Sequence, residues 1–495
     1  MDNSVGDLKG MASIICLVQE GNYMVASTNN GSLYKLESDD SSLVLFASEE
    51  IFLIKLLNRI IELSKWFKKS KIEQIKKNAS VVIAGGREIA EINYDDSNGD
   101  VLNIVQDIQR IYTLEIKHTD FSRFDIDFEK IKKIQRCTKC VLPATMPFIE
   151  FDEKGVCNYC RGYKKVKYRG KSELNKWREN VLANNMKSMV SFSGGRDSSY
   201  GLHYFVKEMG VKPVAYCYDW GMVTDIARRN QSRMCQELGI ELILVSADIR
   251  KKRENIRKNV EAWLKKPSLG MIPIFMAGDK QYYYYCNKLR NDYRFDRVLM
   301  ATNPFEKTYF KAGFCGVRPD ILKRVYRKLD LERLEMSDVA KMTGYYFSQY
   351  INNLAYINSS IVDTMTATMS FYIIPHNYFR LFDYIEWNEN EIDNVLLQNY
   401  GWEKSPDCDT TWRIGDGTAP FYNYIYCMVA GLTENDTLRS NQIREGMLSR
   451  DMALDLVYRD NAVRFDSLKW YFEAIDVDME KALGVIKKMP KLYER

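Results

Sequence analysis

The sequence predicts an α/β protein whose central domain contains a parallel sheet. Residues 187–218 read as a strand, a Gly/Ser-rich turn, a helix and a second strand, which together make one βαβ unit. Short apolar segments come earlier in the chain, followed by two closely spaced cysteine pairs, and mainly helical spacing begins near Pro319. We therefore expect a β-rich N-terminal domain, a small metal-binding ribbon, the parallel sheet and a mainly helical C-terminal region.

The first 128 residues contain the β-rich pattern. Strands are predicted at 13–18, 23–26, 32–36 and 43–46, and residues 50–68 have helical spacing. Cys16 lies within the first apolar strand, so we expect it to pack in a core.

Four cysteines form two CxxC pairs, separated by sixteen residues: Cys137, Cys140, Cys157 and Cys160. Two such pairs supply four thiolates to one tetrahedral ion, which is the zinc-ribbon pattern. An iron–sulfur cluster can use the same ligands. We expect Zn²⁺ in a closed, structural site, because nothing else in the sequence suggests redox chemistry.

The turn at 193–199 separates a strand at 189–192 from a helix at 200–209. In an open parallel sheet, ligands bind at the carboxyl ends of strands, and a helix N-terminus attracts an anion. The turn offers two glycines for close approach, three hydroxyl groups, a cation and a carboxylate: Gly194, Gly195, Ser193, Ser198, Ser199, Arg196 and Asp197. Asp197 would repel a phosphate unless it binds a metal or caps the turn. The turn lacks the GxxxxGK[ST] pattern, which disfavours simple γ-phosphate hydrolysis.

The later chain continues the alternation of helices and strands. Helices are predicted at 225–238 and 250–266, and strands at 241–245 and 297–301. A polar loop at 301–306 follows the last of these strands and should reach the same ligand edge. Residues 372–387 read as extended, and helices are predicted at 389–400 and 444–459.

Residues 193–198 read Ser-Gly-Gly-Arg-Asp-Ser and match the SGGxDS signature of the PP-loop ATP pyrophosphatases. This resemblance implies an adenine nucleotide alpha hydrolase-like sheet that uses ATP and Mg²⁺. In that superfamily a carbonyl oxygen attacks the α-phosphate, pyrophosphate leaves, and a nitrogen or sulfur nucleophile then displaces AMP. It makes Ser193, Arg196 and Asp197 candidate catalytic residues. The candidate ATP-binding residues are Ser193, Gly194, Gly195, Asp197, Ser198 and Ser199.

The order of motifs beyond this loop resembles the N-acetyl sugar amidotransferase family over roughly residues 135–460. The motifs are the two CxxC pairs, SGGxDS, and the segments 269–273, 303–306, 383–387 and 400–402. The resemblance implies an asparagine synthetase-like ligase that adenylates the acetamido oxygen of a nucleotide-linked N-acetyl sugar. Ammonia from a separate glutaminase subunit then forms an acetamidine, in the biosynthesis of lipopolysaccharide O-antigen or another surface glycan. By position, Tyr218 and Asp219 would border the adenine and ribose, and Asn303, Glu306 and Lys311 would face the sugar.

The N-terminal region resembles the later half of a class II glutaminase domain, in segments 8–13, 23–27 and 45–50. Those glutaminases use an N-terminal cysteine as the nucleophile, whereas this chain begins Met1-Asp2. We expect a degenerate domain without glutaminase activity.

The rival interpretation is a PP-loop sulfurtransferase that thiolates tRNA or a small molecule through the same adenylate. It would need a reactive cysteine near the loop, for which Cys217, Cys235 and Cys315 are candidates. A net charge of +5 over 495 residues is weak support for nucleic acid, which we expect as a partner only under this alternative. The three histidines, His118, His203 and His376, are far apart in the sequence.

Length and composition suit several globular domains. Hydrophobic residues make up 46% and charged residues 28% of the chain. The expected boundaries are 1–128 for the glutaminase-like domain, 129–165 for the zinc ribbon, 166–320 for the PP-loop domain and 321–495 for the helical region. No run of about 18 apolar residues and no signal peptide pattern is present, so we expect a cytoplasmic protein that does not bind membranes.

Overall fold

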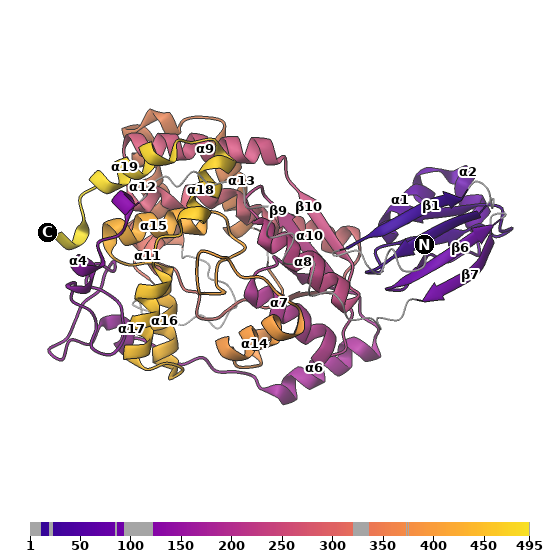
Figure 1. Cartoon of the computed structure of the whole chain (residues 1–495), viewed down its shortest axis with the longest axis horizontal. Coiled ribbons are helices and arrows are strands. Elements are labelled where there is room, and N and C mark those ends of the chain that lie inside the picture. The colour runs from indigo at the N-terminus through magenta and orange to yellow at the C-terminus, as the bar shows by residue number, and fades with distance from the viewer. Residues whose placement is uncertain are drawn as a thin grey trace. The chain divides into compact units, whose positions relative to one another are not determined.

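The computed structural model describes residues 11–18, 23–84, 87–93, 122–319, 336–372, 374 and 376–494. The chain divides into two compact units, one formed mainly by residues 1–123 and the other by most of residues 124–495 (Figure 1). Met1, Asp2, segment 8–10 of the glutaminase-like pattern and His118 lie outside the described residues.

The first unit consists of antiparallel sheets. One sheet has the order β1 (Ser13–Val18), β2 (Tyr23–Thr28), β6 (Ala79–Ala84) and β7 (Arg87–Asn93). The other has the order β4 (Val44–Ala47), β3 (Tyr34–Glu37) and β5 (Glu73–Gln74). The sequence pattern located the first four strands within two residues but missed β5, β6 and β7.

Two details of this unit differ from expectation. The helix predicted at 50–68 is divided into α1 (Glu50–Arg59), α2 (Ile61–Ser64) and a 3₁₀ turn at Lys65–Phe67, because Ile60 has non-helical dihedral angles. Cys16 is only half-buried, since β1 is an edge strand that leaves Leu17 78% exposed. The expected core role of Cys16 was therefore wrong.

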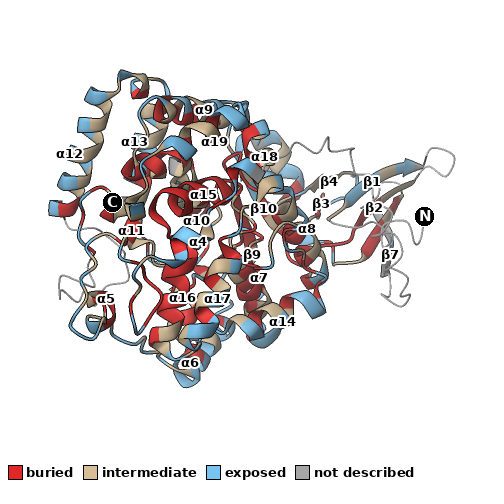
Figure 2. Cartoon of the chain, turned by 60° about the vertical axis from the view of Figure 1, so that its left-hand side comes forward, coloured by how far each residue is buried: buried red, intermediate tan, exposed pale blue. Residues whose placement is uncertain are grey.

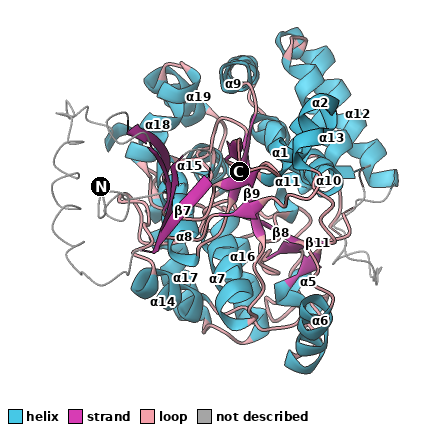
Figure 3. Ribbon diagram, turned by 90° about the vertical axis from the view of Figure 1, so that its right-hand side faces the viewer, coloured by secondary structure: helices cyan, strands magenta, loops and turns pink. Residues whose placement is uncertain are grey.

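The second unit is built on a parallel five-stranded sheet, as predicted. Its strand order is β10 (Leu242–Ser246), β9 (Val214–Asp219), β8 (Ser188–Ser191), β11 (Arg297–Met300) and β12 (Phe379–Arg380). Figure 3 shows β8, β9 and β11 among the surrounding helices. Successive strands run outward from β8 in one direction and from β11 in the other, so the strand order reverses between β8 and β11. Such a switch point is where an open α/β sheet binds its ligand.

Helices surround this sheet. Those that precede the C-terminal region in the chain are α4 (Phe128–Lys132), α5 (Asn158–Arg161), α6 (Lys171–Ala183), α7 (Arg196–His203), α8 (Asp225–Leu238), α9 (Ile249–Lys265), α10 (Tyr282–Asp292) and α11 (Tyr309–Gly313). Short π or 3₁₀ segments follow α7 at Tyr204–Glu208 and α9 at Leu269–Gln281. The helix predicted at 200–209 begins earlier than expected. Its N-cap is Gly195, so α7 starts at Arg196, inside the predicted turn.

The C-terminal region is mainly helical, as predicted. It comprises α12 (Met336–Asn352), α13 (Ser360–Tyr372), α14 (Glu389–Asn399), α15 (Ala419–Ala430), α16 (Glu434–Glu445), α17 (Arg450–Asp460), α18 (Phe465–Ile475) and α19 (Met479–Lys488). In Figure 2, α15 and α16 are largely buried, whereas α12 is largely exposed or intermediate. Among the helices described, none has both the length and the apolar character needed to span a bilayer.

The helix predicted at 444–459 was wrong in its extent. Gly446 has a φ of +88°, a left-handed conformation that ends α16, and the Ser449 side chain accepts from the Met452 amide to cap α17. The extended segment predicted at 372–387 was also wrong in its extent. Among its described residues, Phe379–Arg380 form the strand β12 and Leu381–Asp383 form a 3₁₀ turn.

Candidate active site and cysteine cluster

The turn after β8 has the geometry of an anion-binding loop. Gly194 has a φ of +76°, which a side chain would disfavour, and α7 begins directly after Gly195. Ser193 Oγ and Ser198 Oγ lie 3.0 Å apart, and the Gly195 amide donates to Ser193 Oγ over 3.3 Å. The loop therefore presents hydroxyl groups beside a helix N-terminus at the switch point of the sheet.

Ser199 is not placed with these hydroxyl groups. Its side chain is fully buried, and its Oγ accepts a hydrogen bond of 3.1 Å from Trp402 Nε1. Ser199 thus fastens α7 to the chain after α14.

Arg196 also points into the protein. Its side chain is 1% exposed, and Nη1 donates to Glu389 Oε1 over 2.7 Å and to Thr411 Oγ1 over 3.2 Å. The guanidinium lies 5.0 Å from the ring centre of Trp387. In this structure the Arg196 side chain is directed to Glu389 and Thr411 and anchors the start of α7.

Asp197 lies at the start of α7 with 12% of its side chain exposed. Trp387 Nε1 donates to Asp197 Oδ1 over 2.5 Å. This hydrogen bond fixes the carboxylate with one oxygen toward the indole, and a carboxylate oxygen is the ligand type that Mg²⁺ prefers.

The segment after β11, a loop followed by helix α11, supplies the three residues that the family resemblance assigns to the sugar. Asn303 is 4% exposed; its Oδ1 accepts from the Phe305 amide over 2.9 Å, and its amide nitrogen has no partner among the described residues. Glu306 accepts from Trp412 Nε1 and lies 3.5 Å from Arg413 Nη2. Lys311 Nζ is 2.6 Å from Glu434 Oε1.

Glu306 and Lys311 belong to one ionic cluster, completed by Arg413, Tyr422 and Glu434. Arg413 Nε is 3.2 Å from Glu434 Oε2, and the Tyr422 hydroxyl donates to the same oxygen over 2.9 Å. Lys311 Nζ lies 3.9 Å from the ring centre of Tyr422. Acids and bases therefore alternate along the cluster, from Glu306 through Arg413 and Glu434 to Lys311.

Burial governs the charges of the ionic cluster. It raises the pKa of Glu306, with the Asp197 charge as a further cause, and it lowers the pKa of Lys311. Burial would also raise the pKa of Glu434, but Arg413 and Lys311 outweigh it and lower that pKa to about 2. The Glu434 side chain is 0% exposed, whereas Arg413 keeps 29% of its side-chain surface accessible. Arg413 is thus the member best placed to meet a ligand.

Tyr218 and Asp219 lie at the carboxyl end of β9, next to β8. The Tyr218 hydroxyl donates to Gln281 Oε1 over 3.1 Å, and its ring stacks on Tyr285 with 5.0 Å between centres. Asp219 accepts from the Gly221 amide over 2.9 Å and from Arg228 Nη2 over 2.8 Å. Both residues are therefore held rigidly at the ligand edge.

The sequence analysis did not identify Arg413, Tyr422 and Glu434 as site residues. It also did not predict that Glu389 and Trp387 contact Arg196 and Asp197 after β8. A signal for Arg413 exists in the sequence, because residues 410–418 form a polar, glycine-containing stretch between helices. Arg413 has a φ of +56° there, an uncommon conformation for a non-glycine residue.

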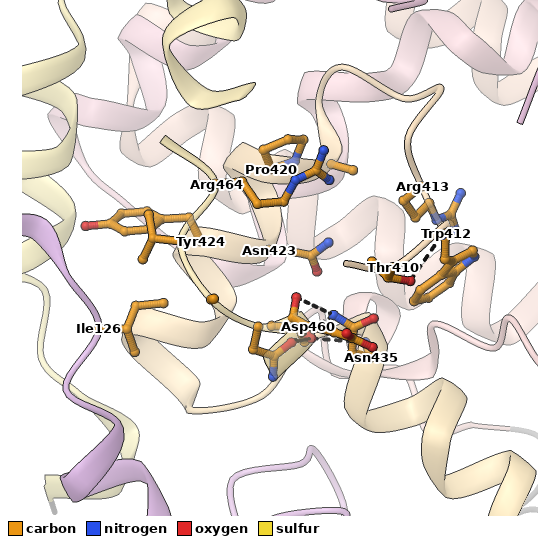
Figure 4. Close-up of a pocket in the computed structure, with 15 residues that line it drawn as sticks. Ile126, Thr410, Trp412, Arg413, Pro420, Asn423, Tyr424, Asn435, Asp460 and Arg464 are labelled. Atoms are coloured by element: carbon orange, nitrogen blue, oxygen red, sulfur yellow. Dashed lines mark hydrogen bonds between the residues drawn. The ribbon is translucent and has the colours of Figure 1, made fainter. Parts of the chain in front are cut away.

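A pocket adjoins the ionic cluster and shares Arg413 with it, and the pocket is also lined by Trp412, which donates to Glu306. Figure 4 shows these two residues on one side of the pocket, Tyr424 on the other and Asn423 between them. The cavity volume is about 40 Å³, which is room for about three waters. A nucleotide does not fit in that space, so the pocket is not assigned to ATP.

The four predicted cysteines form a single buried cluster, and all four sulfurs lie within 4.8 Å of one another. Cys140 Sγ and Cys157 Sγ are 3.8 Å apart, and Cys137 Sγ and Cys160 Sγ are 4.0 Å apart. Thiolates about 2.3 Å from one tetrahedral zinc lie about 3.8 Å from each other. The spacing therefore fits one ion bound by all four sulfurs.

Hydrogen-bond donors surround these sulfurs. The amides of Lys139, Cys140 and Cys157 donate to Cys137 Sγ over 3.4, 3.4 and 3.2 Å. Arg444 Nε donates to Cys160 Sγ and Arg444 Nη2 to Cys140 Sγ, each over 3.3 Å. Such donors stabilise thiolates, the form in which cysteine binds a metal.

A scan against protein-family models gave no match, and a search of curated proteins found none either.

Proposed function

We propose that this protein is an ATP-dependent amidotransferase that cleaves ATP to AMP and pyrophosphate. One observation supports this most: the Gly194–Ser198 turn and the loop with Glu306 lie on either side of the switch point of a parallel sheet. ATP at the first loop would meet an acceptor substrate at the second. The absence of a γ-phosphate lysine from the first loop favours attack at the α-phosphate.

The proposed substrate is a nucleotide-linked N-acetyl sugar. Its acetamido oxygen attacks the α-phosphorus and pyrophosphate leaves, and ammonia then adds to the activated carbon as AMP departs. The amide N–H proton is lost to water when the oxygen is adenylated. The protonated acetamidine then retains all three hydrogens of ammonia, so the second step releases no proton and needs no strong base. Lys311 and Arg413 would bind the polar groups of the acceptor, and Asp197 would hold Mg²⁺ at the phosphates.

The sulfurtransferase alternative finds less support in the structure. Cys217, Cys235 and Cys315 are buried, with 3%, 0% and 5% of their surface exposed. Burial raises the pKa of Cys315 to about 12, which keeps it a thiol rather than the reactive thiolate. None of the three has the exposed, electropositive setting of a catalytic cysteine.

The identity of the products tests the proposal directly. Protein incubated with ATP, Mg²⁺, a nucleotide-linked N-acetyl sugar and ammonium should release AMP and pyrophosphate in equal amounts. Asp197→Ala should lower this rate by a factor of about 10² or more, because it removes the proposed metal ligand. Release of ADP, or AMP formation that requires tRNA and sulfide in place of sugar and ammonium, would contradict the proposal.

We further propose Zn²⁺ as the ion of the cysteine cluster, in a structural role. The four sulfurs close the coordination shell and leave no open position for substrate. The cysteine cluster is therefore not assigned a part in ATP cleavage.

A further inference from the structure

Helix α16 is polar on every side and yet lies inside the protein. Leu438 and Ile443 are its only apolar residues, and ten of its twelve residues are buried. A buried helix is normally apolar around its whole circumference, because each buried polar group needs a partner. The residues that contact α16 therefore indicate which parts of the protein this helix positions.

The N-terminal and middle parts of α16 contact the candidate active site. Glu434, the first residue, is the buried acid of the ionic cluster. Arg439 Nη1 and Gln442 Nε2 both donate to Glu389 Oε2, the latter over 2.9 Å. The other oxygen of Glu389 accepts from Arg196, so α16 determines the position of the first residue of α7.

A second contact reaches the loop after β11. Asn441 Nδ2 donates to the Phe305 carbonyl over 2.9 Å, and Arg444 Nη1 donates to Asn441 Oδ1 over 2.7 Å. The Phe305 ring packs edge-on against Trp387, with 5.6 Å between the ring centres, and Trp387 holds Asp197. Both loops of the candidate active site therefore depend on the position of α16.

The C-terminal part of α16 contacts the cysteine cluster. Arg444 is 8% exposed, and two of its nitrogens donate to cysteine sulfurs. A divalent ion with four thiolates has a net charge of −2, which is the counter-charge that a buried guanidinium requires. The ion would hold Cys140 Sγ and Cys160 Sγ at the positions where they accept from Arg444. Without the metal these two acceptors are no longer fixed relative to each other, and the present position of Arg444 is no longer favoured.

We propose that Arg444 is a positioning residue that couples metal occupancy of the cysteine cluster to nucleotide binding at the loop after β8. With metal bound, Arg444 fixes α16 so that Arg439 and Gln442 hold Glu389 and, through it, Arg196. Metal loss releases α16 and loosens the nucleotide loop. This inference rests on the proposed function, because it assumes that the loop binds ATP.

Linkage provides the test, since two coupled ligands must change each other's affinity by the same factor. The full chain is loaded with Co²⁺, whose tetrathiolate complex absorbs visible light, and competed with a chelator in the presence and absence of a non-hydrolysable ATP analogue. Affinity for the analogue is measured separately on metal-loaded and metal-depleted protein. We expect both factors to agree and to lie between about 5 and 150.

Two variants identify the residue responsible. Arg444→Met preserves most of the side-chain volume and removes the charge, so the coupling factor should fall to about 1. Arg450→Met is the matched control, because Arg450 Nε donates to the carbonyls of Cys137 and Cys140 over 3.1 and 3.2 Å but not to a sulfur. The control should bind metal less tightly and retain the coupling.

The outcomes separate this inference from the proposed function. If the metal-loaded protein binds no ATP analogue, both are wrong. If it binds the analogue equally well with and without metal, or if Arg450→Met abolishes the coupling as fully as Arg444→Met, only the coupling is wrong. Loss of the helical circular dichroism signal on metal removal would show a folding role and would also overturn the positioning role.

Discussion

The orientation of single side chains decides how the SGGxDS loop works. The sequence predicted the turn, its two glycines and its position after a strand, and the structure has all three. It could not show that Arg196 points inward, because Glu389 and Thr411 are 193 and 215 residues away along the chain. The same separation hid Trp387, whose indole holds Asp197 from 190 residues away.

The Asp197–Trp387 hydrogen bond gives a prediction for metal binding. Trp387→Phe preserves an aromatic ring beneath Arg196 and removes the N–H that fixes the carboxylate. A hydrogen bond to a charged group contributes about 1.5–3 kcal/mol, so the Kd for Mg·ATP should rise at least about tenfold. Titration calorimetry measures this change.

The matched control is Trp402→Phe, which removes the corresponding N–H bond to Ser199 on the buried side of α7. It should lower stability without changing the Mg²⁺ dependence of ATP binding. Equal effects of the two variants on that dependence would contradict the assigned role of Trp387.

Glu389 gives a prediction for stability against pH. Burial would raise its pKa, but Arg196 and Arg439 outweigh burial and lower the pKa to about 2. A carboxylate with a lowered pKa in the folded state stabilises the fold above its unfolded pKa of about 4.3, and this contribution disappears as pH falls toward 2. The shift corresponds to about 3 kcal/mol.

Urea unfolding at a series of pH values tests this prediction. Glu389→Gln should be less stable than the wild type by about 3 kcal/mol at pH 7, and the difference should shrink between about pH 5 and pH 2. Glu391→Gln on the same helix, where the amide oxygen can still accept the hydrogen bond from Tyr200, should retain the acid profile of the wild type. A difference for Glu389→Gln that does not change with pH would refute the assignment.

At the scale of whole elements, sequence periodicity located the helices and strands that have one apolar face. It missed elements that lack such a face. The strand, turn, helix and strand around the loop were predicted because their patterns are strong. Helix α16 was not predicted, because its polar residues occur on all sides and resemble a solvated segment. Its burial is a tertiary effect, determined by ion pairs with Lys311, Arg136 and Glu389.

The cysteine cluster gives a prediction at this scale. Cys157→Ser should abolish stoichiometric metal binding, which is one ion per chain in the wild type, because a hydroxyl replaces one of four thiolates. Elemental analysis measures the metal, and proteolysis reports the loosening of residues 137–160. Cys286→Ser is the control, since Cys286 is buried far from the cluster in sequence and belongs to helix α10. Full metal content in Cys157→Ser, or an iron–sulfur absorption band in the wild type, would refute the zinc assignment.

For the whole molecule, the sequence predicted which kinds of sheets, helices and clusters occur, and in which order. It predicted less well which residues belong to each of them. Antiparallel sheets, a cysteine cluster, a parallel sheet and C-terminal helices are all present in the predicted order. The parallel sheet nevertheless includes β12 from beyond residue 320, and the ionic cluster combines Glu306 and Lys311, which follow β11, with Arg413, Tyr422 and Glu434. Local patterns do not specify such long-range pairings, because they depend on packing between distant segments.

The nitrogen source gives a prediction about how the whole chain works. Cys16 pairs with Val25 inside β1, and its nitrogen is part of a peptide bond, so it has no free α-amine to act as a base. The purified chain with ATP and the N-acetyl sugar should therefore turn over with ammonium, and with glutamine only after a separate glutaminase is added. Cys16→Ala should leave the ammonium-dependent rate unchanged. Glutamine-dependent turnover by the chain alone, lost in Cys16→Ala, would show that the first unit is an active glutaminase.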